Sequence, residues 1–326
     1  MQEAILDFHK QFSFQPELKQ AENFYPQSKF VVCGMGGSHL AADILKSVKP
    51  ELPLFIHKNY GLPLLPEEEL SASTIIISSY SGNTEEVVDG FYQAVEQGYQ
   101  VVVITTGGQL LDLAKRHKVP YIQLPQVGIQ PRMALGYSFK ALLKIIGDEN
   151  LWKEAEELAL WLNPADYESY GSYLQEKLIG KVPIIYSSER NQAIAYNWKI
   201  KLNETGKIPA FYNIFPELNH NEMTGFDVRE SSRGLADNFF FIIIKDRDDL
   251  PQIRKRMDIL ERLYLDRNLP IEVLELIGNN HLQKIFSSLL IADWLALKTA
   301  KYYGLEPEQV PMVEEFKEKM RKADTE

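Results

Sequence analysis

This chain has little cysteine, no excess of basic residues and no long apolar runs. Its single cysteine among 326 residues, Cys33, cannot form an internal disulfide, which is typical of a reducing compartment. Aspartate and glutamate number 45 against 35 lysines and arginines, and the resulting charge of −10 disfavours nucleic acid as a partner. The longest apolar runs, such as 239–244, are far shorter than the roughly 20 residues that cross a bilayer. We therefore expect a cytoplasmic protein without a nucleic-acid or membrane partner.

Metal-binding motifs are also missing. The 6 histidines are scattered, and the chain has no H-E-x-x-H pattern and no Cys/His cluster. The glycine-rich turn at 34–38 is neither a dinucleotide motif, which needs G-x-G-x-x-G, nor a Walker loop, which needs a following Gly-Lys-Ser/Thr. These absences predict that the protein uses neither a metal ion nor a nucleotide cofactor.

What the chain does contain is a repeated alternation of β-branched runs and amphipathic helical patterns. In the first half, the patterns predict strands at 30–33, 52–57, 74–78, 100–104 and 119–124, and helices at 39–48, 85–97, 110–117 and 133–146. In the second half, they predict strands at 182–186, 239–244 and 271–276, and helices at 152–162, 167–179, 192–202, 250–266, 281–303 and 313–322. Residues 1–24 are predicted to form one or two short helices, and 61–70 a turn region. This alternation predicts an α/β fold of two similar domains, 1–150 and 151–326, each a parallel sheet flanked by helices.

Two strand-to-helix turns in the first half carry groups that suit an anion. The first turn, 34–38, is rich in glycine, and the second turn, 78–84, is rich in hydroxyls. Each alone could be an ordinary βα turn, but both should meet at the carboxyl edge of one sheet, where open α/β folds bind ligands. Free backbone N–H groups and the helix dipole favour phosphate there. The candidate ligand-binding residues are Gly36, Gly37, Ser38, Ser79, Ser81 and Thr84.

These two turns resemble the sugar isomerase (SIS) domain, whose members bind phosphosugars. The Asn203-Glu204 pair and the Glu-Leu-Asn-His-Asn-Glu run at 217–222 are similar to segments of the bifunctional phosphoglucose/phosphomannose isomerase family. The resemblance covers nearly the whole chain. It implies two flavodoxin-like SIS domains, a phosphosugar substrate and a homodimer.

Glu204 is the candidate base for such a reaction. Interconversion of an aldose and a ketose moves a proton between C1 and C2 through an enediolate, which requires a base and support for the oxyanion. From spacing alone, a surface ion pair with Lys201 or Lys207 explains Glu204 better. The resemblance implies the catalytic role instead.

Arg132 and Lys298 are the candidate cations. Arg132 follows a proline at a predicted helix start, where the dipole disfavours a cation, so a compensating partner is expected. An ion pair with Asp148 or Glu149 would satisfy it, whereas the resemblance implies a place near the substrate oxyanion. The resemblance also implies a lysine late in the last long helix; Lys298 fits best, with Lys301 as the alternative, and either could simply be solvated.

His220 is the candidate for opening the sugar ring, since a neutral imidazole moves protons near pH 7. Its alternative role is to cap the turn at 216–221. The resemblance implies that His220 reaches the active site of the neighbouring subunit.

The resemblance, together with these residues, implies a metal-independent isomerase that interconverts glucose 6-phosphate, and mannose 6-phosphate, with fructose 6-phosphate through a cis-enediolate. Two other interpretations remain open: a SIS-fold sensor that binds a phosphosugar without catalysis, and an isomerase of another phosphosugar.

Overall fold

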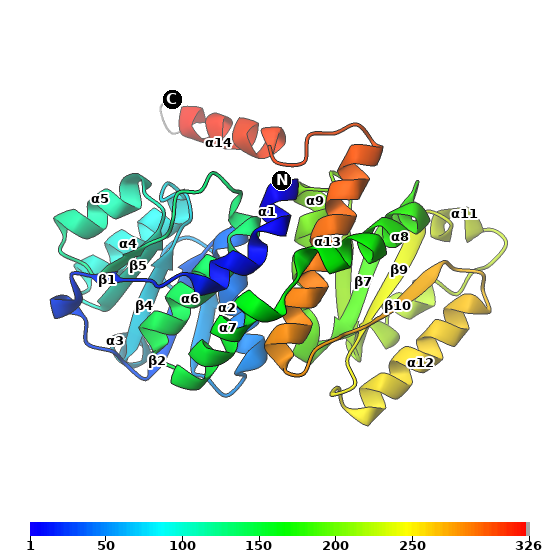
Figure 1. Ribbon diagram of the computed structural model, residues 1–326, viewed down its shortest axis with the longest axis horizontal. Coiled ribbons are helices and arrows are strands. Elements are labelled where there is room, and N and C mark those ends of the chain that lie inside the picture. The colour runs from blue at the N-terminus through cyan, green and yellow to red at the C-terminus, as the bar shows by residue number, and fades with distance from the viewer. Residues whose placement is uncertain (324–326) are drawn as a thin grey trace.

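Two sheets lie side by side in the computed structural model, which describes residues 1–323 (Figure 1). The first sheet has 6 strands in the order β1-β6-β5-β4-β2-β3, and the second has 4 in the order β10-β9-β7-β8. All neighbouring strands are parallel except β1 and β6. Helices cover the sheets, so the predicted α/β fold with parallel sheets is confirmed.

The strands of the first sheet are β1 (Leu18–Lys19), β2 (Lys29–Gly34), β3 (Leu54–His57), β4 (Ser73–Ser78), β5 (Gln100–Thr105) and β6 (Tyr121–Gln123). Those of the second sheet are β7 (Val182–Ser188), β8 (Phe211–Phe215), β9 (Phe239–Lys245) and β10 (Ile271–Glu275).

The helices of the first half are α1 (Gln2–Leu6), α2 (Leu40–Val48), α3 (Glu67–Ser71), α4 (Glu85–Glu96), α5 (Gly108–Arg116), α6 (Leu135–Ile146) and α7 (Glu149–Trp161). Those of the second half are α8 (Glu168–Leu178), α9 (Gln192–Glu204), α10 (Glu222–Gly225), α11 (Arg233–Ala236), α12 (Pro251–Leu265), α13 (His281–Tyr302) and α14 (Pro311–Ala323). Short 3-10 turns are η1 (Phe8–Ser13), η2 (Ala21–Asn23), η3 (Gly36–Ser38), η4 (Pro131–Met133), η5 (Pro164–Tyr167), η6 (Glu189–Asn191) and η7 (Glu217–Asn219).

Burial on both faces explains the continuous apolar runs of the central strands. Ile75, Ile76 and Ile77 of β4 are all fully buried. Ile76 packs in a core that includes Ala41 of α2, whereas its two neighbours pack in a separate core with Phe91 of α4. Because successive side chains of a strand point to opposite faces, a strand covered on both sides must be apolar at every position.

The largest core joins the two sheets. It holds Val32 and Ile76 from the first sheet and Ile185 and Ile242 from the second, together with side chains of α9 and α13. The division of the chain at residue 150 stays a prediction.

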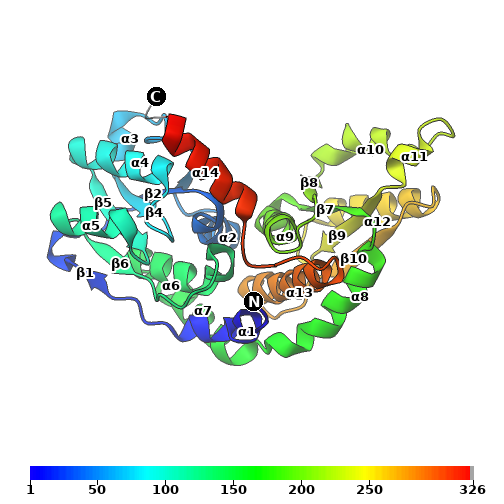
Figure 2. The ribbon, with the colours of Figure 1, turned by 90° about the horizontal axis from the view of Figure 1, so that it is seen from above.

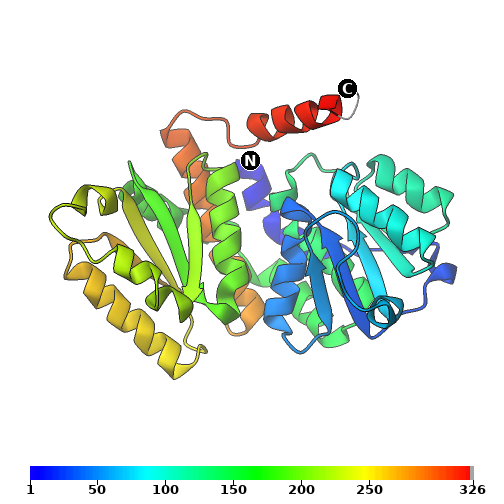
Figure 3. The same cartoon turned by 180° about the vertical axis from the view of Figure 1, so that it is seen from behind.

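Helix α9 connects opposite edges of the two sheets and stands between them (Figure 3). It begins directly after β7 and η6, at the carboxyl edge of the second sheet, and ends beside η4, which follows the last strand of the first sheet. A helix of this length measures about 20 Å at 1.5 Å per residue. The carboxyl edges of the two sheets therefore lie at opposite ends of α9.

The carboxyl-terminal part of the chain returns to the first half. After α13, the chain crosses back and α14 lies over the first sheet and its helices (Figure 2). Among residues 1–323, no helix combines the length and the apolar character that a membrane span requires.

Candidate functional site

The glycine-rich turn follows β2 at the carboxyl edge of the first sheet, as predicted. Gly36 has φ +51°, a left-handed conformation that favours glycine. A Cβ on Gly37 would lie 2.7 Å from the Cβ of Pro131 and 2.9 Å from the backbone nitrogen of Arg132. Only glycine at 37 lets the turn at 34–38 pack directly against η4, which brings Arg132 to it.

Hydrogen bonds join the glycine-rich turn to the hydroxyl-rich turn. The backbone N–H of Tyr80 donates to the Ser38 hydroxyl at 2.9 Å, and the Ser78 hydroxyl donates to the Ser38 carbonyl at 2.9 Å. The two predicted turns therefore meet at one edge of the sheet. A third turn joins them: the Thr106 hydroxyl donates to the Tyr80 carbonyl at 2.7 Å, and a Cβ on Gly82 would overlap the Gly107 carbonyl oxygen.

Thr84 occupies the predicted N-cap position of α4, but its side chain does not cap the helix. Its hydroxyl lies 2.9 Å from that of Ser79 instead, and Ser79 also accepts a hydrogen bond from Gly82 at 3.1 Å. Ser79 is fully buried, whereas Ser81 is exposed. The first turn of α4 is thus left without a side-chain cap, and Ser81 is the more accessible of these two serines.

Glu204 and Arg132 are in contact beside these turns. Arg132 Nη1 lies 3.1 Å from Glu204 Oε2, and Arg132 Nε donates to the Thr205 hydroxyl at 2.7 Å. Arg132 is 1% exposed, and the Glu204 side chain is 35% exposed. The alternative partner Asp148 pairs with Lys49 instead of Arg132.

The alternative role of Glu204, a surface ion pair with Lys201 or Lys207, is also wrong: neither ion pair forms among the described residues. Lys201 pairs with Asp293 at 2.6 Å, and the Lys207 ammonium donates to the backbone carbonyl of Glu204 at 2.6 Å rather than to its carboxylate. The carboxylate of Glu204 is left to Arg132 and to the open side of the site.

A segment that the sequence did not reveal closes over Arg132. We call Pro307–Gln309 the strap; it lies between α13 and α14. Arg132 Nη2 donates to the carbonyls of Pro307 and Glu308 at 2.8 and 3.0 Å, and Lys207 donates to the carbonyl of Gln309. The amino terminus pairs with the Glu308 side chain. Since every residue has a carbonyl, no sequence signal could have identified these acceptors.

Burial shapes the charges of the site. It lowers the pKa of the Arg132 guanidinium, and the neighbouring Glu204 carboxylate opposes that shift. It also lowers the pKa of Lys207, and the positive charge of Arg132 adds to the effect. Burial raises the pKa of the Tyr80 hydroxyl to about 12. Tyr80 therefore remains a neutral hydrogen-bonding group at physiological pH.

Lys298 lies on another face of α13, away from Glu204. Its ammonium pairs with Glu168 of α8 at 2.6 Å and lies 5.7 Å from the ring centroid of Trp294. The alternative, Lys301, donates to Gln2 at 3.0 Å. The structure does not bring either lysine to the Arg132–Glu204 pair.

His220 lies at the other carboxyl edge. Strand β8 ends at Phe215, opposite Ser188 at the end of β7, and His220 follows directly after η7. It is exposed, and its backbone N–H donates to Glu217 at 2.9 Å. Because Glu204 is at the far end of α9, His220 and Glu204 of one chain do not share a site.

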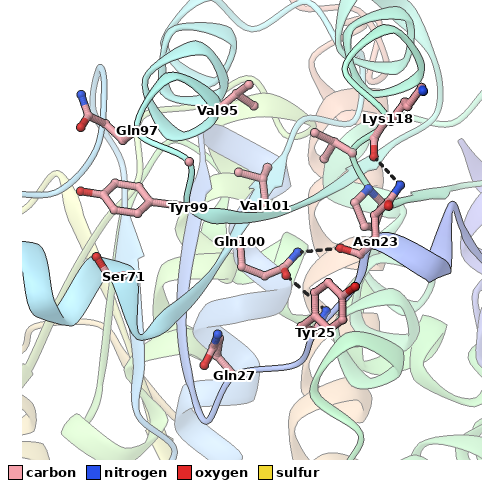
Figure 4. A pocket seen from close by; sticks show the side chains of 13 residues that line it. Asn23, Tyr25, Gln27, Ser71, Val95, Gln97, Tyr99, Gln100, Val101 and Lys118 are labelled. Carbon is pink, nitrogen blue, oxygen red and sulfur yellow. Dashed lines mark hydrogen bonds between the residues drawn. The ribbon is translucent and has the colours of Figure 1, made fainter.

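A cavity of about 520 Å³ lies away from all of these residues, at the amino-terminal edge of the first sheet (Figure 4). The Gln100 side chain there accepts from the backbone N–H of Tyr25 at 3.2 Å and donates to the carbonyl of Asn23 at 3.3 Å. The cavity opens at the edge of the sheet opposite to the strand-to-helix turns and Glu204, so it is not the candidate active site. Within residues 1–323, no three His, Cys, Asp or Glu side chains gather as metal ligands would.

Residues 168–320 match the family model for the bacterial phospho-glucose isomerase C-terminal SIS domain. The fold is similar to that of glucosamine-6-phosphate deaminase from Thermotoga maritima, with a TM-score of 0.67 at 17% identity, covering 95% of this chain and 97% of that one. The part of the chain at 168–320 is therefore similar to a SIS domain.

Two relatives are similar over most of their length, and both are named bifunctional phosphoglucose/phosphomannose isomerase. The protein from Aquifex aeolicus is 31% identical over 97% of this chain and 96% of its own. That from Caldicellulosiruptor bescii is 33% identical over 90% of this chain and 89% of its own. The chain belongs to the bifunctional phosphoglucose/phosphomannose isomerase family.

Proposed function

We propose that this protein is a phosphohexose isomerase that interconverts glucose 6-phosphate and mannose 6-phosphate with fructose 6-phosphate. The observation that carries the proposal is the contact between Glu204 and Arg132, 3.1 Å, next to the turn that contains Gly37. It sets a carboxylate base and a cation beside a geometry that suits phosphate. The names of the relatives from Aquifex aeolicus and Caldicellulosiruptor bescii support the same activity.

The joined turns hold the phosphate in this proposal. Backbone N–H groups at the start of η3 and α4 donate to its oxygens, and hydroxyls add further hydrogen bonds. The residues assigned to the phosphate are Gly36, Gly37, Ser38, Ser79, Ser81 and Thr84. Of the two turns, the hydroxyl-rich one offers Ser81 at the surface, whereas Ser79 supports the turn from inside.

Glu204 moves the proton between C1 and C2, and Arg132 supports the charge that develops on the enediolate oxygens. A guanidinium has five N–H hydrogens. The described contacts of Arg132 use Nε once, Nη1 once and Nη2 twice, which leaves one Nη1 hydrogen for a substrate oxygen. Glucose 6-phosphate and mannose 6-phosphate differ only at C2 and give the same enediolate. A site with room for either configuration at C2 can therefore act on both sugars, and the proton transfer itself calls for no metal.

His220 opens the sugar ring of the neighbouring subunit in this proposal, and the protein works as a homodimer in the cytoplasm. Its exposure and its distance from Glu204 of its own chain support a role across the interface. Lys298 is the second cation of this proposal and stabilises the enediolate together with Arg132. That role requires its pair with Glu168 to open when substrate binds.

The test is to incubate the purified protein with fructose 6-phosphate in excess EDTA and to quantify the two aldose phosphates separately. Formation of both is expected. Formation of glucose 6-phosphate alone would support the proposed mechanism but exclude mannose 6-phosphate as a substrate. Saturable binding without turnover would instead support the sensor, and conversion of glucosamine 6-phosphate in preference would support another phosphosugar.

The base is tested by Glu204→Gln, with Glu96→Gln at the exposed end of α4 as the matched control. Glu204→Gln should bind fructose 6-phosphate but lose turnover by roughly 1,000-fold or more, since the amide cannot accept the proton. Glu96→Gln should behave as the wild type. Near-normal turnover of Glu204→Gln would remove Glu204 as the base.

A further inference from the structure

A buried ion pair lies directly behind the Arg132–Glu204 pair. Lys201 on α9 and Asp293 on α13 are 2.6 Å apart, and both side chains are 1% exposed. The Lys201 ammonium also lies 3.4 Å from the backbone carbonyl of Arg132. One ammonium thus touches both a buried carboxylate and the main chain of the residue that holds Glu204.

The helical spacing of α9 links this pair to the candidate base. Lys201 precedes Glu204 by three residues and Thr205 by four, so all three lie on one side of the last turn. Glu204 and Thr205 both contact the Arg132 side chain, at 3.1 and 2.7 Å. Lys201 contacts its backbone. Contacts from these three residues to Arg132 therefore set the position of the last turn of α9 against η4.

Stability alone does not account for a charge pair at this place. Replacing a buried ion pair by apolar side chains is often neutral or stabilising, because both charges must leave water. The second oxygen of Asp293, Oδ2, has no hydrogen-bond partner among the described residues, although it is buried. The Asp293 charge is also felt at the site, where it opposes the lowering of the pKa of Arg132 by burial.

We propose that Lys201 and Asp293 are a positioning pair for the base. Asp293 holds the Lys201 ammonium, and Lys201 ties the last turn of α9 to the backbone of Arg132, so that the Glu204 carboxylate stays beside the phosphate-binding turns. This inference rests on the proposed function of Glu204. Neither residue contacts substrate; they act through Glu204 and Arg132.

The experiment measures kcat and KM for fructose 6-phosphate in Lys201→Met, Asp293→Asn and Lys201→Arg. Misplacement of a reacting group by about 1 Å can cost roughly 100-fold in rate. We expect kcat of Lys201→Met and Asp293→Asn to fall about 10- to 100-fold, while KM changes by less than about threefold because the phosphate is held by other turns. Lys201→Arg keeps the charge and should recover part of kcat.

A matched control lies on α13, the helix that carries Asp293. Lys284 of α13 forms an equally buried pair with Asp246, with side chains 1% and 0% exposed, at the carboxyl edge of the second sheet. Lys284→Met should lower the melting temperature as much as Lys201→Met but lower kcat far less, because the Lys284–Asp246 pair does not contact Glu204 or Arg132. If Lys201→Met does not fold, Asp293→Asn and Lys201→Arg carry the comparison.

Two results would overturn the positioning pair: folded Lys201 and Asp293 variants with kcat within about twofold of the wild type, or an equal loss of kcat in Lys284→Met. Glu204→Gln in the same series separates this failure from that of the proposed function. If Glu204→Gln turns over normally, Glu204 is not the base. If it is inactive while the Lys201 and Asp293 variants are fully active, only the positioning role fails.

Discussion

At the scale of single residues, Arg132 is the most connected side chain of the site. Its guanidinium contacts the carboxylate of Glu204 at the end of α9 and the hydroxyl of Thr205, which follows α9. It also contacts two backbone carbonyls of the strap. A planar guanidinium suits such divergent acceptors because its donors point in fixed directions. A lysine, with one nitrogen, cannot reach them all.

Arg132→Lys should therefore fail although it keeps the charge. We expect kcat for fructose 6-phosphate to fall roughly 100-fold, the cost typical of losing an oxyanion donor. The free energy of unfolding should fall by about 2 kcal/mol, because hydrogen bonds to a buried charge are lost. Steady-state kinetics and urea denaturation measure the two effects.

Arg267→Lys is the matched control. Arg267 contacts Asp227 through Nε and Nη2 at 2.9 and 2.8 Å, in a half-exposed pair of the second half. Its replacement should leave kcat unchanged and change stability little, because exposed ion pairs contribute little to stability. An Arg132→Lys variant with normal kcat would show that charge alone suffices at this position.

Residue types could be predicted from the sequence, but their contacts could not. The resemblance indicated Glu204 and Arg132 as separate candidates, and their roles stay predictions. Their contact joins positions 72 residues apart in the sequence, so it depends on how η4 packs against α9. Lys298 shows the same limit: a late position on α13 does not say which face it takes, and its ammonium lies on Glu168.

At the scale of elements, the long periodic segments were predicted well and the short ones were missed. Strand β8 is a five-residue edge strand, and four of its residues are exposed or half-buried, so it lacks a clear apolar pattern. Helix α3, at 67–71, overlaps the turn region predicted at 61–70. Strand β1 lies in a segment predicted as helical, and it is only two residues long, set by pairing with β6.

The contact between the glycine-rich turn and η4 leads to a second prediction. Gly37→Ala places a Cβ 2.7 Å from Pro131 and 2.9 Å from the Arg132 nitrogen, so backbone must move. We expect the KM for fructose 6-phosphate to rise about tenfold and stability to fall by about 1–3 kcal/mol, as in other overpacked sites. Kinetics and thermal denaturation provide the measurement.

Gly234→Ala controls for the added methyl group. A Cβ at this glycine, in α11, meets nothing within 4 Å. The variant should match the wild type in KM and melting temperature. An unchanged KM in Gly37→Ala would mean that the turn and η4 move apart without consequence for phosphate binding.

The start of α13 leads to a prediction about pH. Burial lowers the pKa of His281 to about 4 from an ordinary value near 6.5, and its Nε2 lies 2.9 Å from Asn191 Oδ1. Between those two pH values the unfolded chain binds a proton that the folded chain does not, so stability falls as pH decreases. The slope from this group approaches about 1.4 kcal/mol per pH unit.

Urea denaturation between pH 7 and pH 4.5 tests this dependence. His281→Gln should lose less stability over the range than the wild type, because glutamine does not titrate. His117→Gln, at an exposed position, should follow the wild type. Parallel curves for the wild type and His281→Gln would contradict the assignment.

At the scale of the whole molecule, the sheets determine how the candidate residues are divided. Glu204 and the two turns proposed to bind phosphate lie at the carboxyl edge of the first sheet, and His220 lies at that of the second, about one α9 length away. The sequence predicted two parallel sheets but could not predict their relative direction, which depends on how α9 and α13 pack. In one chain, the carboxyl edge of the first sheet therefore has Glu204 without His220, and that of the second sheet has His220 without Glu204.

Two inactive variants should therefore restore each other. In a homodimer with His220 donated across the interface, a heterodimer of Glu204→Gln and His220→Ala has one site with both defects and one with neither. Random co-assembly makes half of the dimers heterodimers, so activity should recover to roughly a quarter of the wild type. Fructose 6-phosphate turnover is measured after co-expression, and each variant expressed alone is the control. If the mixture is no more active than its parts, both residues act within one chain or His220 does not act at all; size-exclusion chromatography of the mixture shows whether heterodimers could have formed.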